Sequence, residues 1–135
     1  MEKVAVYASF KNQNSKSIEF TLKQLANWCL MKNYDYTFYF DKIKNRLDNL
    51  NNRKELNNLK EDIANKEYSK IVIKDITQLS RNTFYNVEFI KFLNDNNCQI
   101  ECMDGLDLTL YKKIFDRFNE KKEEKERWTT KLKEK

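Results

Sequence analysis

The sequence predicts an α/β fold with a mainly parallel sheet of about four strands and helices on both faces. Four apolar, β-branched runs alternate with segments of helical spacing, and this alternation implies right-handed βαβ crossovers. The chain of 135 residues suits one domain with a real core. Its 40% apolar and 35% charged residues are a balance typical of a globular protein.

The predicted strands are short runs of apolar, aromatic and β-branched residues. They cover residues 3–9, 35–41, 69–75 and 98–103. The third run is apolar at its centre, which indicates a strand inside the sheet. Gly105, the one glycine, follows the fourth run as a breaker.

The predicted helices have apolar residues three or four positions apart. They cover about residues 17–33, 53–66, 83–96 and 107–132. Ser17 can cap the first of them. The apolar stripe of the third is Phe84, Val87, Ile90 and Leu93.

Three polar stretches separate these elements and predict loops. Residues 10–16 are polar, and residues 76–82 indicate a loop or a short helical turn. Residues 42–52 are rich in Asn and Lys and predict a mobile loop, with a possible turn around Leu47 and Leu50.

Composition excludes several classes of site. The chain has no histidine, which excludes a histidine general base and histidine-ligated zinc. A single glycine excludes the glycine-rich loops that cradle dinucleotides and nucleoside triphosphates. We therefore expect no metal, no cofactor and no nucleotide. The net charge of +5 favours a polyanion, either nucleic acid or an anionic membrane surface.

Targeting signals and cysteines point to a reducing compartment. The N-terminus lacks the pattern of a signal peptide, and no apolar run is long enough to cross a bilayer. Cys29, Cys98 and Cys102 form no CxxC pair and suit buried thiols. We expect a cytoplasmic protein that does not enter a membrane.

Four segments carry a more specific signal. They are residues 4–8 (VAVYA), 17–29 (SIEFTLKQLANWC), 52–56 (NRKEL) and 72–82 (VIKDITQLSRN). Together they resemble the catalytic domain of the serine recombinases, the resolvase/invertase family, over about residues 3–118. The resemblance implies a three-layer resolvase-like fold that ends in a long helix. It also implies DNA cleavage and rejoining by a serine that becomes linked to a 5′ phosphate, with arginines stabilising the phosphoryl group.

The positions that match the family motifs carry over unevenly. Arg81 matches the second arginine of the LSRN-type signature, Arg53 matches the arginine after the second strand, and Asp41 matches an acidic residue at the end of that strand. The family's other groups are replaced. Lys11 occupies the nucleophile position, Ser9 and Gln78 occupy two arginine positions, and Thr21 occupies a glutamine position.

These replacements predict binding without strand cleavage. A lysine ammonium is protonated near neutral pH and attacks phosphodiesters poorly. Lys11, Arg53 and Arg81 could still form a basic pocket of phosphate size. Ser9 is the alternative nucleophile, although strand geometry puts it about 6–7 Å back from residue 11, inside the sheet.

The C-terminal part is predicted to be one long helix over residues 107–135, which follows the α/β domain of residues 1–106. Its inner half would pack on the domain, and its charged outer half would extend from it. Apolar side chains along this helix predict self-association or contact with another protein. They are Leu110, Ile114, Phe115, Phe118, Trp128 and Leu132. Active members of the family carry a DNA-binding domain after this helix, so we expect no sequence-specific reading of DNA here.

Three functions stay open. The first is a recombinase-like protein without cleavage activity that binds DNA or a protein partner as a regulator on a mobile element, which the Lys-, Asn- and Ile-rich composition of an AT-rich genome also suggests. The second is an active recombinase with a displaced nucleophile. The third is a protein-interaction or inhibitor module that kept only the fold.

Overall fold

The protein is a three-layer α/β domain with a four-stranded parallel sheet, as predicted. The computed structural model describes residues 1–106, 108, 113 and 116–117. The strands are β1 (Glu2–Lys11), β2 (Tyr34–Ile43), β3 (Lys70–Ile73) and β4 (Gln99–Cys102). They lie in the order β2-β1-β3-β4, and every neighbouring pair is parallel. β1 and β3 are therefore the inner strands.

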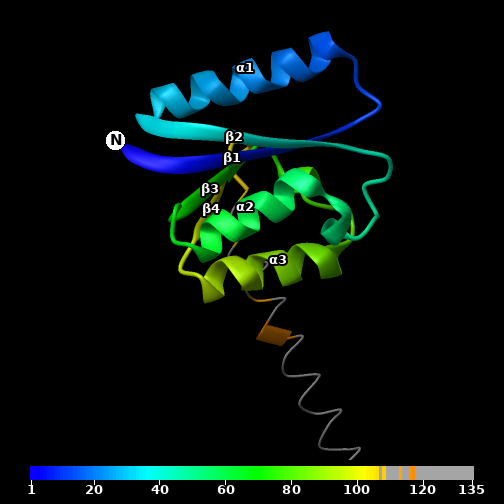
Figure 1. Ribbon diagram of the computed structural model, residues 1–135, viewed down its shortest axis with the longest axis vertical. Coiled ribbons are helices and arrows are strands. Elements are labelled where there is room, and N and C mark those ends of the chain that lie inside the picture. Colours follow the sequence, from blue (N-terminus) through cyan, green and yellow to red (C-terminus); the bar gives the residue numbers. More distant parts are fainter. Residues whose placement is uncertain (107, 109–112, 114–115, 118–135) are drawn as a thin grey trace, which may run out of the picture.

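Three helices cover the sheet. They are α1 (Ser15–Met31), α2 (Lys54–Ala64) and α3 (Thr83–Asp95), and two short 3-10 helices, η1 (Leu50–Asn52) and η2 (Ile76–Gln78), follow β2 and β3. α1 lies on one face of the sheet, and α2 and α3 lie on the other (Figure 1). This arrangement follows from right-handed crossovers between parallel strands.

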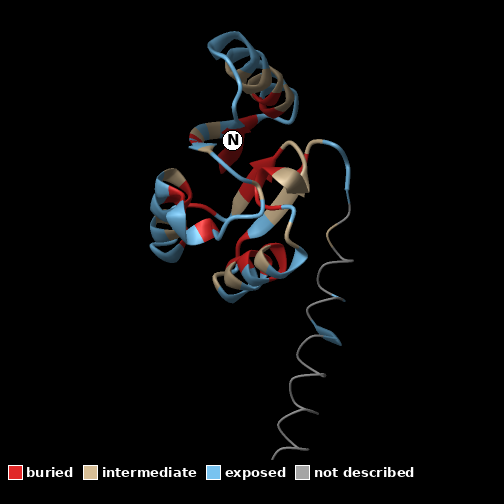
Figure 2. Cartoon of the chain, turned by 90° about the vertical axis from the view of Figure 1, so that its right-hand side faces the viewer, coloured by how far each residue is buried: buried red, intermediate tan, exposed pale blue. Residues whose placement is uncertain are grey.

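The long β1 strand belongs to both cores because its side chains alternate between the two faces. Val4, Val6 and Ala8 pack with α1, whereas Ala5 and Tyr7 pack with α2 and α3. All of these residues are fully buried, and Figure 2 shows the buried strands between exposed helix surfaces. An apolar run without polar alternation is what a strand covered on both faces requires.

The first crossover differs from its prediction at two points. β1 continues to Lys11, so Lys11 is the last residue of the strand and does not lie in a loop. α1 begins at Ser15, and its cap is Asn14, whose side chain accepts a hydrogen bond from Ser17 N at 2.9 Å. Ser17 is therefore not the cap, because asparagine three residues earlier satisfies the free N–H group.

The later segments also differ in detail. Phe84 is 46% exposed and Phe89 is buried, so the stripe of α3 turns toward Phe89. The stretch predicted as a mobile loop contains the end of β2 and the helix η1, with Leu50 buried and Leu47 exposed. The helix predicted over residues 107–135 lies almost wholly outside the described residues.

The cysteines are buried and free, as predicted. Burial raises the pKa of Cys29 and of Cys98 to about 11 and that of Cys102 to about 12, so these thiols stay protonated. Within residues 1–106 and the few described beyond them, no helix is long and apolar enough to cross a membrane. The same residues contain no cluster of acidic, cysteine or histidine side chains suited to a metal ion.

Candidate functional site

The carboxyl ends of β1 and β3 form a polar site where the sheet opens. The pairing of β1 with β3 ends at Tyr7 and Ile73, but β1 continues beyond that point. The N–H of Ser9 is therefore left without a strand partner on that side, and Gln78 Oε1 accepts it at 2.9 Å. Ser9 Oγ donates to the Gln78 carbonyl oxygen at 2.6 Å. These two bonds hold η2 against the end of β1.

Arg53 lies beneath this contact and not on the surface. It is only 4% exposed, and its Nη1 donates to the Gln78 carbonyl oxygen at 2.8 Å and to Tyr7 Oη at 3.4 Å. Its Nη2 has no hydrogen-bond partner among the described residues. The structure thus places Arg53 under the predicted phosphate pocket.

Asp41, the acidic residue at the end of β2, fixes the start of α2. Its carboxylate accepts the backbone N–H groups of Glu55 at 2.9 Å and Leu56 at 3.0 Å, and the hydroxyl of Tyr7 at 2.9 Å. Arg53, the residue before α2, provides no side-chain cap. A carboxylate from a neighbouring strand thus satisfies the free N–H groups of the helix and faces its positive end.

Arg46 belongs to the same site, although nothing in the sequence analysis selected it. Its Nη1 donates to Ser9 Oγ and to the Thr77 carbonyl oxygen, both at 2.9 Å, and its Nη2 donates to the Ser9 carbonyl oxygen at 3.3 Å. Burial lowers the pKa of Arg46, and the nearby guanidinium of Arg53 lowers it further. An arginine with a lowered pKa still carries its charge at neutral pH.

Arg81 and Lys11 lie at the exposed side of this edge. Both are exposed. The backbone N–H of Arg81 donates to the Arg46 carbonyl oxygen at 3.1 Å, and its charge contributes to the lowered pKa of Arg46. We call Arg46, Arg53 and Arg81 the arginine cluster. In the described part of the chain, none of the three forms an ion pair with a carboxylate.

The other residues selected from the sequence lie elsewhere. Thr21 is half-buried on α1, which covers the opposite face of the sheet. The apolar residues predicted to form a dimer helix lie outside the described residues. They are Leu110, Ile114, Phe115, Phe118, Trp128 and Leu132.

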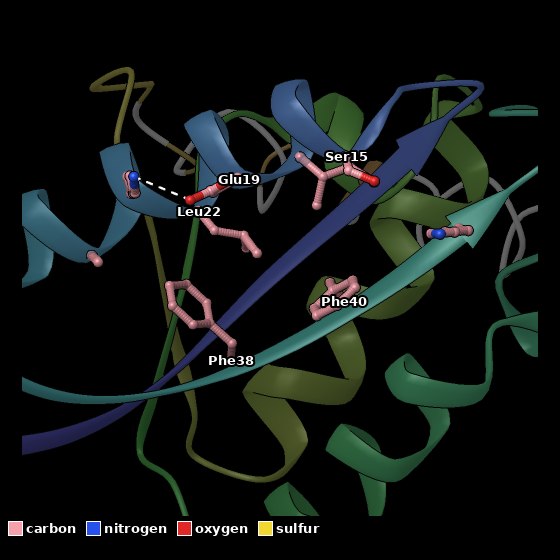
Figure 3. A pocket seen from close by; sticks show the side chains of 9 residues that line it. Ser15, Glu19, Leu22, Phe38 and Phe40 are labelled. Carbon is pink, nitrogen blue, oxygen red and sulfur yellow. Dashed lines mark ion pairs between the residues drawn. The ribbon is translucent and has the colours of Figure 1, made fainter.

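A groove of about 390 Å³ lies between α1 and β2, on the opposite face from Ser9. Figure 3 shows Leu22 of α1 facing Phe38 and Phe40 of β2, with Ser15 and Glu19 along the helix. Glu19 is engaged with Lys23 at 3.1 Å. The groove is mainly apolar and lacks converging charges, so the arginine cluster is the stronger candidate site.

The cluster is suited to an anion and not to nucleophilic attack. Guanidinium groups bind phosphate oxygens in pairs, and here they have only neutral protein acceptors. The Ser9 hydroxyl does lie against the Arg46 guanidinium, but Ser9 is 1% exposed and its proton is engaged by a carbonyl oxygen. No hydrogen bond from a base reaches that hydroxyl within the described residues, and a serine nucleophile needs one.

Comparison with known proteins identifies the family. Residues 5–128 match the family model described as Resolvase, N terminal domain. The chain belongs to this family. No curated protein matches the sequence of this resolvase-family chain.

Solved structures show the same fold. The N-terminal catalytic domain of TP901-1 integrase is 21% identical, with a TM-score of 0.73 over 91% of this chain and 98% of that one. A resolvase family site-specific recombinase from Streptococcus pneumoniae is 19% identical, with a TM-score of 0.65 over 96% of this chain and 93% of that one. The C-terminal catalytic domain of ISC1926 TnpA, an IS607-like serine recombinase, is 21% identical, with a TM-score of 0.63 over 74% and 69% of the two chains.

Proposed function

We propose that this resolvase-family protein binds the DNA backbone through the carboxyl edge of its sheet and does not cut the strands. The observation that carries the proposal is the arginine cluster, which has no carboxylate partner in the described structure and lies beside an exposed lysine at the nucleophile position. Phosphate contacts of this kind supply affinity without reading sequence.

The replaced residues argue against cleavage. Lys11 brings a protonated ammonium to the position where the family resemblance implies a serine. Ser9 and Gln78, at the two arginine positions, bond to each other beneath the surface. Preorganised donors of that kind are each worth several kcal/mol, about 3 or more, in a charged transition state.

A regulatory role would follow from binding alone. A domain that occupies DNA without cutting it can exclude or modify an active recombinase on a mobile element. Association with a second copy or with such an enzyme would place the domain at the same DNA. We include a homo-oligomer or a mixed complex in the proposal for that reason.

The first test measures binding of a short fluorescein-labelled duplex by anisotropy at several salt concentrations. We expect affinity to fall steeply between about 50 and 200 mM salt. Lys11→Ala and Arg81→Ala should each reduce the slope of log K against log salt by about one. Lys32→Ala removes the same charge beside the start of β2, at the opposite edge of the sheet, and should leave the slope unchanged. Absence of binding at low salt would favour the module that kept only the fold.

One observation favours the second candidate, an active recombinase with Ser9 as nucleophile. The Ser9 hydroxyl lies 2.9 Å from a guanidinium nitrogen of Arg46, and it shares the Gln78 carbonyl oxygen with Arg53. A supercoiled plasmid incubated with the protein and quenched in denaturant separates the two functions. We expect no protein attached to a 5′ end. An adduct that disappears in Ser9→Ala would establish the enzyme and end the binding-only proposal.

A further inference from the structure

The segment that joins β2 to η1 is fastened to the carboxyl edge at Arg46. The carbonyl oxygen of Arg46 accepts the hydroxyl of Ser80 at 2.8 Å and the backbone N–H of Arg81 at 3.1 Å. Both contacts come from the loop after η2. A stretch of exposed polar residues therefore presents one half-buried side chain at a fixed place.

The guanidinium of Arg46 is fixed at its other end by neutral groups alone. Its three hydrogen bonds go to the hydroxyl and carbonyl oxygens of Ser9 and to the carbonyl oxygen of Thr77. An arginine that only stabilised the fold would normally meet a carboxylate when it is withdrawn from water. Here its nearest charged influences include two more guanidiniums, those of Arg53 and Arg81.

A second observation points to a missing anion. Arg53 is more than nine-tenths buried, yet its Nη2 has no partner within the described residues. A buried donor without an acceptor costs about 1–3 kcal/mol. A phosphate oxygen held between Arg46 and Arg53 would satisfy this donor and would relieve the repulsion between like charges.

We propose that Arg46 supplies a phosphate-binding guanidinium to the site, at the end of a strand that carries no arginine of its own. Ser9 is then a positioning residue, because its small side chain leaves room for the guanidinium and its two oxygens hold it. The inference rests on the proposed binding of the DNA backbone and adds a residue to it. It gives the segment between β2 and η1 a function.

Two variants separate an anion contact from a structural role. Arg46→Met keeps much of the apolar stem and removes the charge, whereas Ser80→Ala frees the Arg46 carbonyl oxygen and leaves every charge in place. We expect Arg46→Met to weaken duplex binding about tenfold and to reduce the salt slope by about one. Ser80→Ala should weaken binding less and keep the slope. Circular dichroism confirms that each variant is folded.

Inorganic phosphate gives a readout that does not depend on DNA. Phosphate should raise the melting temperature of the wild-type protein relative to chloride at equal ionic strength, because a ligand of the folded state stabilises it. We expect Arg46→Met to lose most of this rise. If wild type binds no duplex but the phosphate effect is lost in Arg46→Met, the role of Arg46 stands and the proposed function fails. An unchanged phosphate effect and an unchanged salt slope in Arg46→Met would overturn the inference.

Discussion

The two edges of the sheet treat their cations in opposite ways. At the amino edge, where the strands begin, Lys70 lies 3.4 Å from a carboxylate oxygen of Glu2 and donates to the hydroxyl of Tyr34 at 3.1 Å. Lys3 pairs there with Glu67 at 3.2 Å. At the carboxyl edge the guanidiniums of the arginine cluster have neutral acceptors or none within the described residues.

The difference indicates which edge evolved to meet another molecule. Paired charges at the amino edge are complete within the protein and leave little field outside it. Unpaired guanidiniums create a positive potential at a place where parallel strands end and ligands commonly bind. The chain has a net charge of only +5, so this local imbalance matters more than the total.

The largest expected effect concerns the carboxylate that builds the carboxyl edge. Asp41→Ala leaves the N–H groups of Glu55 and Leu56 and the hydroxyl of Tyr7 without their acceptor. We expect a loss of about 3 kcal/mol in the free energy of unfolding, measured in urea. Asp35→Ala removes an exposed carboxylate from the same strand and should change stability by less than about 0.5 kcal/mol. Equal losses would mean that Asp41 does not cap α2.

The next prediction compares one tyrosine at each edge. Burial raises the pKa of Tyr7 far above its usual value and raises that of Tyr34 by less, since Tyr7 is fully buried and Tyr34 is reached by some solvent. A raised folded pKa gives stability that is complete below the unfolded pKa of about 10 and is lost as pH rises above it. The loss is about 1.4 kcal/mol per pH unit for each such group.

Tyr7→Phe should therefore flatten the fall in stability between about pH 10 and pH 11, although it costs stability at neutral pH. Tyr34→Phe should flatten it less. Urea unfolding at several alkaline pH values measures both slopes. The edges would not differ in this respect if the two variants had the same pH dependence.

The fold could be predicted almost completely, and the site only in part. Apolar runs such as β3 and the helical spacing of α2 depend on local patterns, which sequence displays directly. Arg81 and Lys11 were selected by resemblance and are exposed as predicted pocket residues should be. The structure does not test whether they bind phosphate.

Arg46 and the burial of Arg53 could not be predicted because both depend on contacts between distant segments. Arg46 lies in a polar stretch without periodicity and reaches back to Ser9. Arg53 is a residue type that is rarely buried, and only the packing of η2 on β1 covers it. The one available signal was topological: segments that follow parallel strands meet at the same edge of the sheet.

At the amino edge we expect a moderate loss from Lys70→Met. This side chain is mostly covered, contacts Glu2 and the Tyr34 hydroxyl, and lies over the Tyr34 ring at 5.1 Å from its centroid. Methionine keeps the apolar stem and removes the charge, so the free energy of unfolding should fall by about 1 kcal/mol. Added salt should reduce this difference. A gain in stability would show that the amino-edge pairing is not favourable.

The smallest expected effect has the opposite sign and is the sharpest test of the comparison. Arg81 lies near two guanidiniums, and its own backbone N–H, which binds the Arg46 carbonyl oxygen, is untouched by a change of side chain. Arg81→Gln should therefore stabilise the free protein by about 0.3 kcal/mol at low salt, because it removes repulsion between like charges. The gain should vanish at about 0.5 M salt, where screening is strong. If Arg81→Gln instead destabilises the protein as Lys70→Met does, then the cations of the carboxyl edge are compensated within the protein, and the edge is not poised for an anion.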